Sequence, residues 1–219
     1  MKGTKGKLSL GAAGCAAGAV NGIFGGGGGM IVVPLLTSVG QKPPLVAHAT
    51  AILVILPVSL ASAIVYLVGG WFDAELFIAV SIGVVLGGAA GAKLLGSITP
   101  AAATVAFAAV MFAAGLRMMF LDEVDMRFLV YLLAGLAGGI LGGMGMGGGT
   151  VLIPILTMFC GVPQHLAQSV NLLSFLPMAA VSLRVHAGNG LLDTKNILWM
   201  IVPATLLSAL GGILVQGVA

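Results

Sequence analysis

Apolar residues fill this chain in long runs, and polar positions cluster at a few points between them. A transmembrane helix needs about 20 mostly apolar residues. The stretches without Asp, Glu, Lys or Arg are 8–41, 43–72, 76–92, 94–116, 128–183 and 196–219. This pattern predicts an all-α polytopic membrane protein, with full spans over 45–68, 74–92, 100–120, 165–187 and 196–216.

Two glycine-rich stretches interrupt the apolar pattern. Residues 22–34 read GIFGGGGGMIVVP, and residues 142–154 read GGMGMGGGTVLIP. Each glycine costs a helix about 1 kcal/mol relative to alanine and leaves backbone polar groups exposed. Irregular backbone at membrane depth persists only where protein buries it or where it lines a cavity, so each break is a candidate substrate site. The helices that we expect to flank the breaks cover 8–21, 30–39, 128–143 and 150–159.

The two breaks belong to an internal duplication. At a constant offset of 120, residues 17–73 and 137–193 share 19 identities. This is well above the identity at roughly one position in ten that the composition would give by chance. We therefore expect one membrane domain made of two tandem repeats. The first, 8–120, has a hairpin and three spans, and the second, 128–219, has a hairpin and two spans and lacks the last one.

Residues 8–39 form either one broken crossing or a re-entrant hairpin. Lys and Arg favour the cytoplasmic side, and both schemes place seven of the nine basic residues there. Hairpins are preferred because each arm is short for a full span, and three crossings in the first repeat then invert the second. We expect inverted repeats in the cell membrane with a cytoplasmic N-terminus. Residues 40–44 and 93–99 are then inside, and 121–127 and 160–164 outside.

The composition agrees with this class. Apolar residues make up 59% of the chain, charged residues 7%, and the net charge of +3 indicates orientation rather than nucleic-acid binding. The basic start before Cys15 imitates a lipoprotein signal, but the apolar run is too short and we expect no cleavage. Cys15 and Cys160 occupy unrelated positions without His or Cys at metal-ligand spacing. We expect neither a disulfide, nor a metal, nor a cofactor.

The glycine motif resembles a known family. Gly22-x-x-Gly25-x-Gly27-Gly28-Gly29-x-x-x-x-Pro34, followed by Ala47-His48-Ala49-Thr50-Ala51, is similar to the TauE/SafE sulfite exporter family, as are the counterparts at 142–154 and 167–171. The resemblance covers nearly the whole chain. It implies export or uptake of sulfite, organosulfonates or related anions, without selecting among them. The usual members have one more span at the C-terminal end.

The distribution of acids also favours an anion, independently of the resemblance. All six acidic residues lie in loops or at span ends, whereas membrane cation sites and carboxylate relays usually bury such groups. The helices expected to begin at Met30 and Thr150 offer free N–H donors and positive dipole ends instead. A small anionic substrate is the partner that these features fit.

The candidate site combines the breaks with polar residues at the starts of the following spans. Those polar residues are also able to bond neighbouring backbone across helix contacts, and both interpretations stay open. His48 is either a proton-coupling group or a neutral structural histidine, and Gln168 takes its place in the other half. The proposed substrate-binding residues are Gly27, Gly28, Gly29, Met30, His48, Thr50, Gly147, Gly148, Gly149, Thr150, Gln168, Ser169 and Asn171.

Two functions remain at this stage. The first is a secondary transporter or permease that moves a small anion across the bilayer, with proton or ion coupling and oligomeric state open. The alternative is a non-transporting membrane scaffold or a channel-like subunit in which the breaks only pack helices. The predicted spans contain no nucleophile–base pair, metal motif or paired carboxylates, so we expect no enzyme and no nucleic-acid partner.

Overall fold

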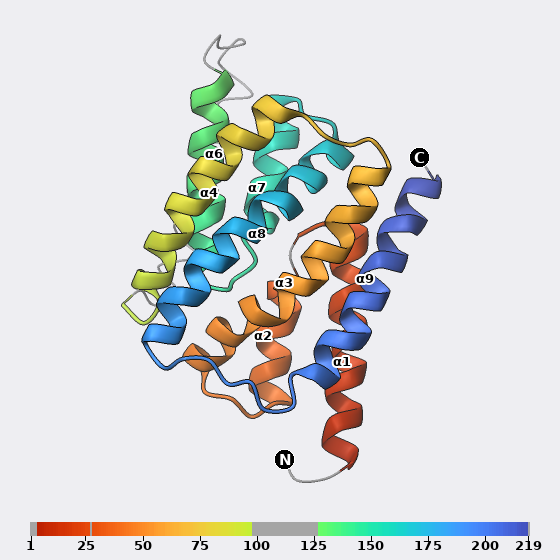
Figure 1. Cartoon of the computed structure of the whole chain (residues 1–219), viewed down its shortest axis with the longest axis vertical. Helices are drawn as coiled ribbons and strands as arrows, with labels where there is room; N and C mark the ends of the chain where they lie inside the picture. Colours follow the sequence, from red (N-terminus) through yellow and green to blue (C-terminus); the bar gives the residue numbers. More distant parts are fainter. Residues whose placement is uncertain (1–3, 27, 98–126, 219) are drawn as a thin grey trace.

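The structure is a computed structural model that describes residues 4–26, 28–97 and 127–218, and all regular structure in these ranges is helical (Figure 1). The predicted span 100–120 lies outside the described residues. One helix, α7, continues directly into a five-residue π-helix, η1. The elements are α1 (Thr4–Phe24), α2 (Gly29–Ser38), α3 (Pro44–Val68), α4 (Ala74–Leu94), α6 (Arg127–Gly143), α7 (Gly149–Pro154), η1 (Ile155–Phe159), α8 (Gln164–Gly188) and α9 (Leu198–Val218).

Four of these helices, α3, α4, α8 and α9, are long and apolar enough to cross a membrane. They confirm the predictions over 45–68, 74–92, 165–187 and 196–216 to within two residues at each end. The first helix differs, because α1 begins at Thr4 instead of residue 8. The Nζ atom of Lys7 lies 5.3 Å from the ring centroid of Trp199, a cation–π contact that keeps a charged residue in the first turns of the helix.

Proline and aspartate set the helix starts. Pro43 and Pro163 occupy equivalent positions before α3 and α8, with nearly the same extended backbone (φ −54°, ψ 144° and φ −54°, ψ 139°). Proline suits a helix start because the N–H group that it lacks would have no intrahelical acceptor at that position. Asp73 caps α4 by accepting a hydrogen bond of 2.8 Å from the Leu76 N–H.

Left-handed turns recur at the 120-residue offset. Such backbone strains most residues with a side chain. In each half of the chain, one such residue follows the first hairpin helix, a second lies between the second hairpin arm and the following span, and a third follows that span. The matched pairs are Gly25 (φ 64°) with Gly145 (φ 77°), Gln41 (φ 51°) with Gly161 (φ 62°), and Gly70 (φ 83°) with Gly190 (φ 66°).

Glycine stripes bring two helix pairs into backbone contact. Small residues allow such close approach between membrane helices, where lipid gives little hydrophobic driving force. The α1 stripe faces α9, and the α6 stripe faces α4, so each hairpin packs on a span from the other half. A Cβ atom would overlap partner backbone at Gly14, Gly18 and Gly22 of α1, and at Gly135, Gly139 and Gly143 of α6.

The two hairpins open toward opposite ends of the molecule (Figure 1). The start of α1 and the α2–α3 connection lie toward the lower end. The start of α6 and the η1–α8 connection lie toward the upper end. Between them α3 and α8 run in opposite directions and pack against each other.

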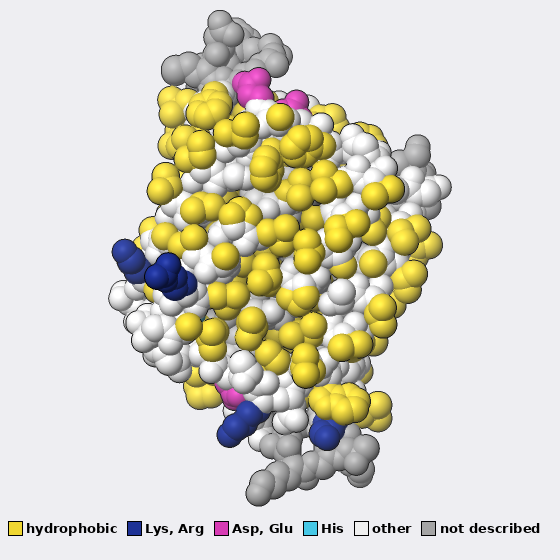
Figure 2. Space-filling view, in the orientation of Figure 1, with side chains coloured by type: hydrophobic (Ala, Val, Ile, Leu, Met, Phe, Trp, Pro, Cys, Tyr) yellow, Lys and Arg dark blue, Asp and Glu magenta, His cyan; other side chains and the backbone are white. Residues whose placement is uncertain are grey.

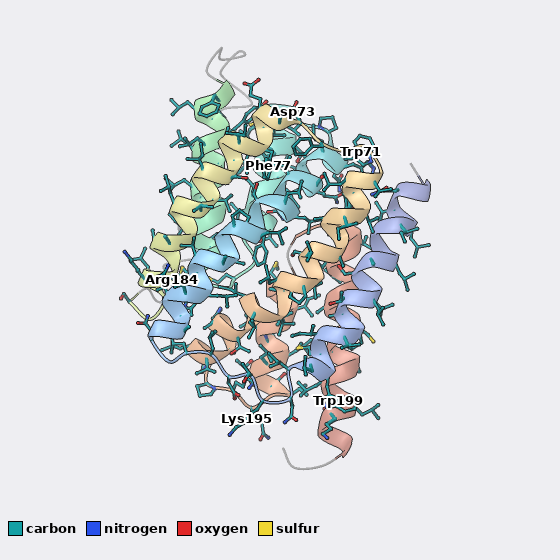
Figure 3. The ribbon with its side chains drawn as sticks, in the orientation of Figure 1. Trp71, Asp73, Phe77, Arg184, Lys195 and Trp199 are labelled. Carbon is teal, nitrogen blue, oxygen red and sulfur yellow. The ribbon has the colours of Figure 1, made fainter. Side chains whose placement is uncertain are left out.

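The surface is apolar and the interior contains a polar seam. Figure 2 shows apolar side chains over the middle of the visible face, with Lys and Arg at its left edge near mid-height and at its lower end. In Figure 3, Lys195 and Trp199 lie at the lower end and Trp71 at the upper end. The seam runs mainly along α3 and α8. Its buried polar side chains are Asn21, Thr50, Ser59, Ser62, Gln168, Ser169, Asn171, Ser174, Ser182, His186 and Ser208.

Candidate functional site

The two glycine breaks touch in the centre of the fold. A Cβ atom at Gly29 would lie 2.7 Å from the backbone nitrogen of Gly147 and 2.9 Å from its Cα. The same Cβ would be 3.1 Å from the carbonyl oxygen of Gly145. The start of α2 is therefore in backbone contact with the second break, which only glycine at these positions allows.

Backbone amides collect at this contact. Ile31 and Val32 donate to the carbonyl of Gly28, which has φ 63° and precedes α2 without a side-chain cap. Among the described residues the Gly29 amide has no acceptor. The first N–H groups of a helix lack intrahelical partners and carry the positive end of its dipole. The start of α2 thus presents donors to the junction of the two breaks.

The second break has a similar organisation, although Gly148 before α7 has right-handed backbone (φ −55°) where Gly28 before α2 is left-handed. Thr150 and Val151 donate their amides to the carbonyls of Gly147 and Gly148. The Thr150 hydroxyl donates to the Gly147 carbonyl at 2.7 Å, so this side chain stabilises the turn. Within the described ranges the buried amides of Gly148 and Gly149 have no acceptor. The helix that follows, α7 with η1, runs continuously over Gly149–Phe159.

Met30 and Gly27 differ from the other residues predicted for the site in the glycine-rich segments. Met30 is 63% exposed, so its side chain points away from the junction and only its backbone is available there. Gly27 lies outside the described residues. The other predicted glycines, Gly28, Gly29 and 147–149, are all buried; Gly29 and Gly147 form the contact between the breaks, whereas Gly28 lies against α1 and Gly148 against α6.

The polar residues of α8 reach back to the first break. The Gln168 side chain donates to the carbonyl of Ile23 at 3.3 Å, and Asn171 donates to the carbonyl of Gly25 at 2.6 Å. These carbonyls lie at the end of α1 or just after it, where helix carbonyls lose their intrahelical partners. Asn171 also lies beside the second break, because a Cβ at Gly149 would overlap its amide group. Both side chains therefore stabilise the break that they line.

Ser169 differs from its two neighbours. Its hydroxyl is buried and has no hydrogen-bond partner among the described residues. Burying a hydroxyl without a hydrogen-bond partner is costly, so this group is a candidate for binding the substrate.

The polar residues of α3 are divided between two places. His48 lies at the second break, where a Cβ at Gly145 would overlap the His48 backbone. The Thr50 hydroxyl instead accepts a hydrogen bond of 3.2 Å from the Asp193 amide in the α8–α9 connection. The contact found for Thr50 is thus to a connecting segment and not to the breaks.

The same connection carries an ion pair. The Lys42 ammonium lies 2.5 Å from the Asp193 carboxylate and joins the α2–α3 and α8–α9 connections. This hydrogen bond is the main reason why the pKa of Asp193 is lower than usual, and the Lys195 amide adds a second one at 2.9 Å. The charged pair therefore stabilises the lower end of the molecule.

Sequence reasoning missed two residues at the breaks, Tyr66 and His186. The Tyr66 hydroxyl donates to the Gln168 side chain at 2.9 Å and lies 3.3 Å from the Gly22 carbonyl. The His186 Nε2 atom lies 2.9 Å from the Gly143 carbonyl. They are 120 residues apart, so the offset that relates the halves was the signal that could have found them.

In the described part of the chain, no group of three His, Cys, Asp or Glu side chains is placed to hold a metal ion. The junction itself consists of amide donors, neutral polar side chains and imidazoles. Such groups bind an anion through hydrogen bonds and helix dipoles.

A family model described as Sulfite exporter TauE/SafE matches residues 10–219. No curated protein matches the chain. No solved structure matches it either.

Proposed function

We propose that this chain, which belongs to the Sulfite exporter TauE/SafE family, is a secondary transporter that binds a small anion, such as sulfite or an organosulfonate, where its two glycine breaks meet. The family is one of membrane transporters, and the four long apolar helices fit that class. The choice of anion and the position of the site are the parts that we propose.

One observation supports the site above all others. Two helices, α2 and α7, begin at the same junction, and their first amides have no acceptor among the described residues. Glycine at these positions keeps side chains out of the junction. An anion without its water shell needs several donors, and oriented amides provide them without a counter-charge. Asn171 lies beside Gly149, Gln168 beside Gly25 and His48 beside Gly145, and we propose that the buried Ser169 hydroxyl completes the site.

We further propose that the repeats are inverted and that the lower end of Figure 1 is cytoplasmic. The opposite openings of the two hairpins support the inversion. Exposed Gln41 and Gly161 occupy equivalent turns, one in each half. Single cysteines at these positions, with Cys15 and Cys160 replaced, should react with an impermeant reagent from opposite sides. Labelling of both from one side would contradict the inversion.

Counterflow in proteoliposomes tests the function. Vesicles loaded with unlabelled sulfite, methanesulfonate or sulfate should transiently accumulate the same labelled anion above the level in empty liposomes, with saturation. The scaffold alternative predicts no saturable counterflow for any of the three anions. A channel-like subunit predicts flux that does not depend on the anion loaded inside.

A further inference from the structure

The ends of α1 and α6 are held by side-chain pairs at equivalent positions but of different chemistry. At the first break, Tyr66 of α3 and Gln168 of α8 bond to each other and lie against the last carbonyls of α1. At the second break the equivalent positions are His186 of α8 and His48 of α3. A neutral hydroxyl and amide thus face one break, and two imidazoles face the other.

The two histidines form one cluster. His186 is fully buried, and its Nε2 atom lies 2.9 Å from the Gly143 carbonyl. His48 lies against the same break, because a Cβ atom at Gly145 would overlap the His48 backbone. The Nδ1 atom of each ring is buried and has no partner among the described residues. Each imidazole therefore has a ring nitrogen that is free to accept a proton.

No charged group of the described residues pairs with this cluster. Lys93 of α4 and Arg184 of α8 are exposed, and Lys42 and Asp193 pair with each other. The remaining ionisable residues of the packed elements whose side chains are described are Lys7 and Cys15 of α1, Tyr66 of α3, Asp73 and Glu75 at the start of α4, Tyr131 of α6, Cys160, His165 of α8, and Lys195.

Protonation of such a cluster is costly unless an anion is near. Burying a charge without a partner is unfavourable, and an anion at the adjacent amides would supply the opposite charge. Conversely, the imidazolium would add a positive charge and a further donor for the anion. Each ligand therefore favours binding of the other, and this coupling is reciprocal.

We propose that His48 and His186 form a proton-binding site that couples one proton to each anion carried. The proposal rests on the anion-transport function proposed above. The proton binds an imidazole nitrogen on the side where the anion enters and leaves with it on the other side. Anion binding then tightens as the pH falls.

The chain offers a matched control. His165 also has a buried Nδ1 atom without a described partner, but its ring packs on Trp71, with centroids 5.0 Å apart, near the start of α8. His165→Gln therefore removes a similar imidazole away from the second break. The test variants are His48→Gln, which introduces the amide found at the equivalent position of the first break, and His186→Gln.

The experiment uses full-length protein in proteoliposomes with methanesulfonate and with sulfate, whose charges stay fixed between pH 5.5 and 8. Wild type and His165→Gln should accumulate labelled anion when an imposed pH gradient is the only driving force, with entry of protons seen by an internal dye. In His48→Gln and His186→Gln, the gradient-driven accumulation divided by the same variant's counterflow without a gradient should fall at least tenfold below that ratio in wild type.

A second measurement covers a variant that folds poorly. In detergent, under conditions where the protein stays folded, the apparent Kd of wild type for methanesulfonate should fall at least fivefold from pH 7.5 to 5.5. This pH dependence should vanish in whichever histidine variant remains folded. Wild-type counterflow without any response to the pH gradient would overturn the proton site and leave the transport function standing. Unchanged gradient-driven accumulation in both variants would overturn it too. Absence of counterflow for every anion would refute the transport function itself.

Discussion

The contact between the two breaks predicts a large effect from the smallest possible substitution, Gly29→Ala. The added Cβ would lie 2.7 Å from the Gly147 nitrogen, and it would also crowd the Gly147 Cα and the Gly145 carbonyl. All three atoms are backbone, so no side chain can rotate to make room. Reaching an ordinary contact of 3.4 Å requires α2 and the second break to separate by about 0.7 Å.

The cost of this separation can be estimated. Overpacking typically destabilises by about 1–3 kcal/mol, and alanine in a helix recovers about 1 kcal/mol relative to glycine. Gly29→Ala should therefore lower the free energy of unfolding by about 0–2 kcal/mol. Binding should suffer more, because site groups need to be held to about 0.5 Å. We expect the apparent Kd for the anion to rise about tenfold or more, which corresponds to about 1.4 kcal/mol.

Gly26→Ala is the matched control, since the one described atom near a Cβ there is the Thr150 methyl carbon at 3.6 Å, an ordinary contact. Counterflow at several anion concentrations gives the apparent affinity, and melting in detergent without anion gives the stability. We expect Gly26→Ala to behave like wild type in both assays. If Gly29→Ala transports with wild-type affinity, the close contact of the breaks has no role in binding.

Three further substitutions test other parts of the structure. Asn171→Leu removes the hydrogen bond to the Gly25 carbonyl and should reduce ligand-free stability by about 1–3 kcal/mol as well as weaken anion binding, both measured by melting with and without anion. Asp193→Asn should cost at most about 1 kcal/mol at pH 7, because its pair with Lys42 is partly exposed. Since the folded pKa of Asp193 is lowered, wild type should lose this stabilisation only as the pH falls from about 4 through the folded pKa, and the variant should lack that dependence in melting curves. Gly18→Leu should prevent α1 from packing on α9 and abolish recovery of monodisperse protein in detergent.

Each of these predictions has an outcome that contradicts it. Unchanged ligand-free melting of Asn171→Leu would show that the Gly25 carbonyl finds another donor. A wild type and an Asp193→Asn variant with the same acid dependence would remove the ion pair from the account of stability. Normal yield of Gly18→Leu, compared with Gly188→Ala at an open position, would contradict the close packing of α1 on α9.

The sequence predicted the described helices well because their limits depend on local chemistry. Proline before α3 and α8, Asp73 before α4, and consecutive glycines in the breaks act within a few residues of where they stand. The predicted start of the first helix, residue 8, follows the last of the N-terminal lysines, whereas α1 begins at Thr4. The contact of Lys7 with Trp199, almost 200 residues away, was not visible in the sequence.

Other features depend on contacts between distant parts of the chain. The capping of α1 by Gln168 and Asn171 joins residues about 145 positions apart, and no local pattern indicates it. The π-helix after Pro154 was also not predicted, although proline, which lacks an N–H, often disturbs the helical hydrogen-bond pattern. The equivalence of the Tyr66 and His186 positions, by contrast, follows from the 120-residue offset alone.

The location of a bound anion tests the central claim most directly. Crystals grown with 2-bromoethanesulfonate would place the bromine by anomalous scattering and the sulfonate by its density. The account predicts sulfonate oxygens about 2.7–3.2 Å from the amides of Gly29 and Gly149, between the two breaks. A sulfonate bound elsewhere in a protein that shows counterflow of this anion, with the amides at the breaks making no contact to it, would contradict the account.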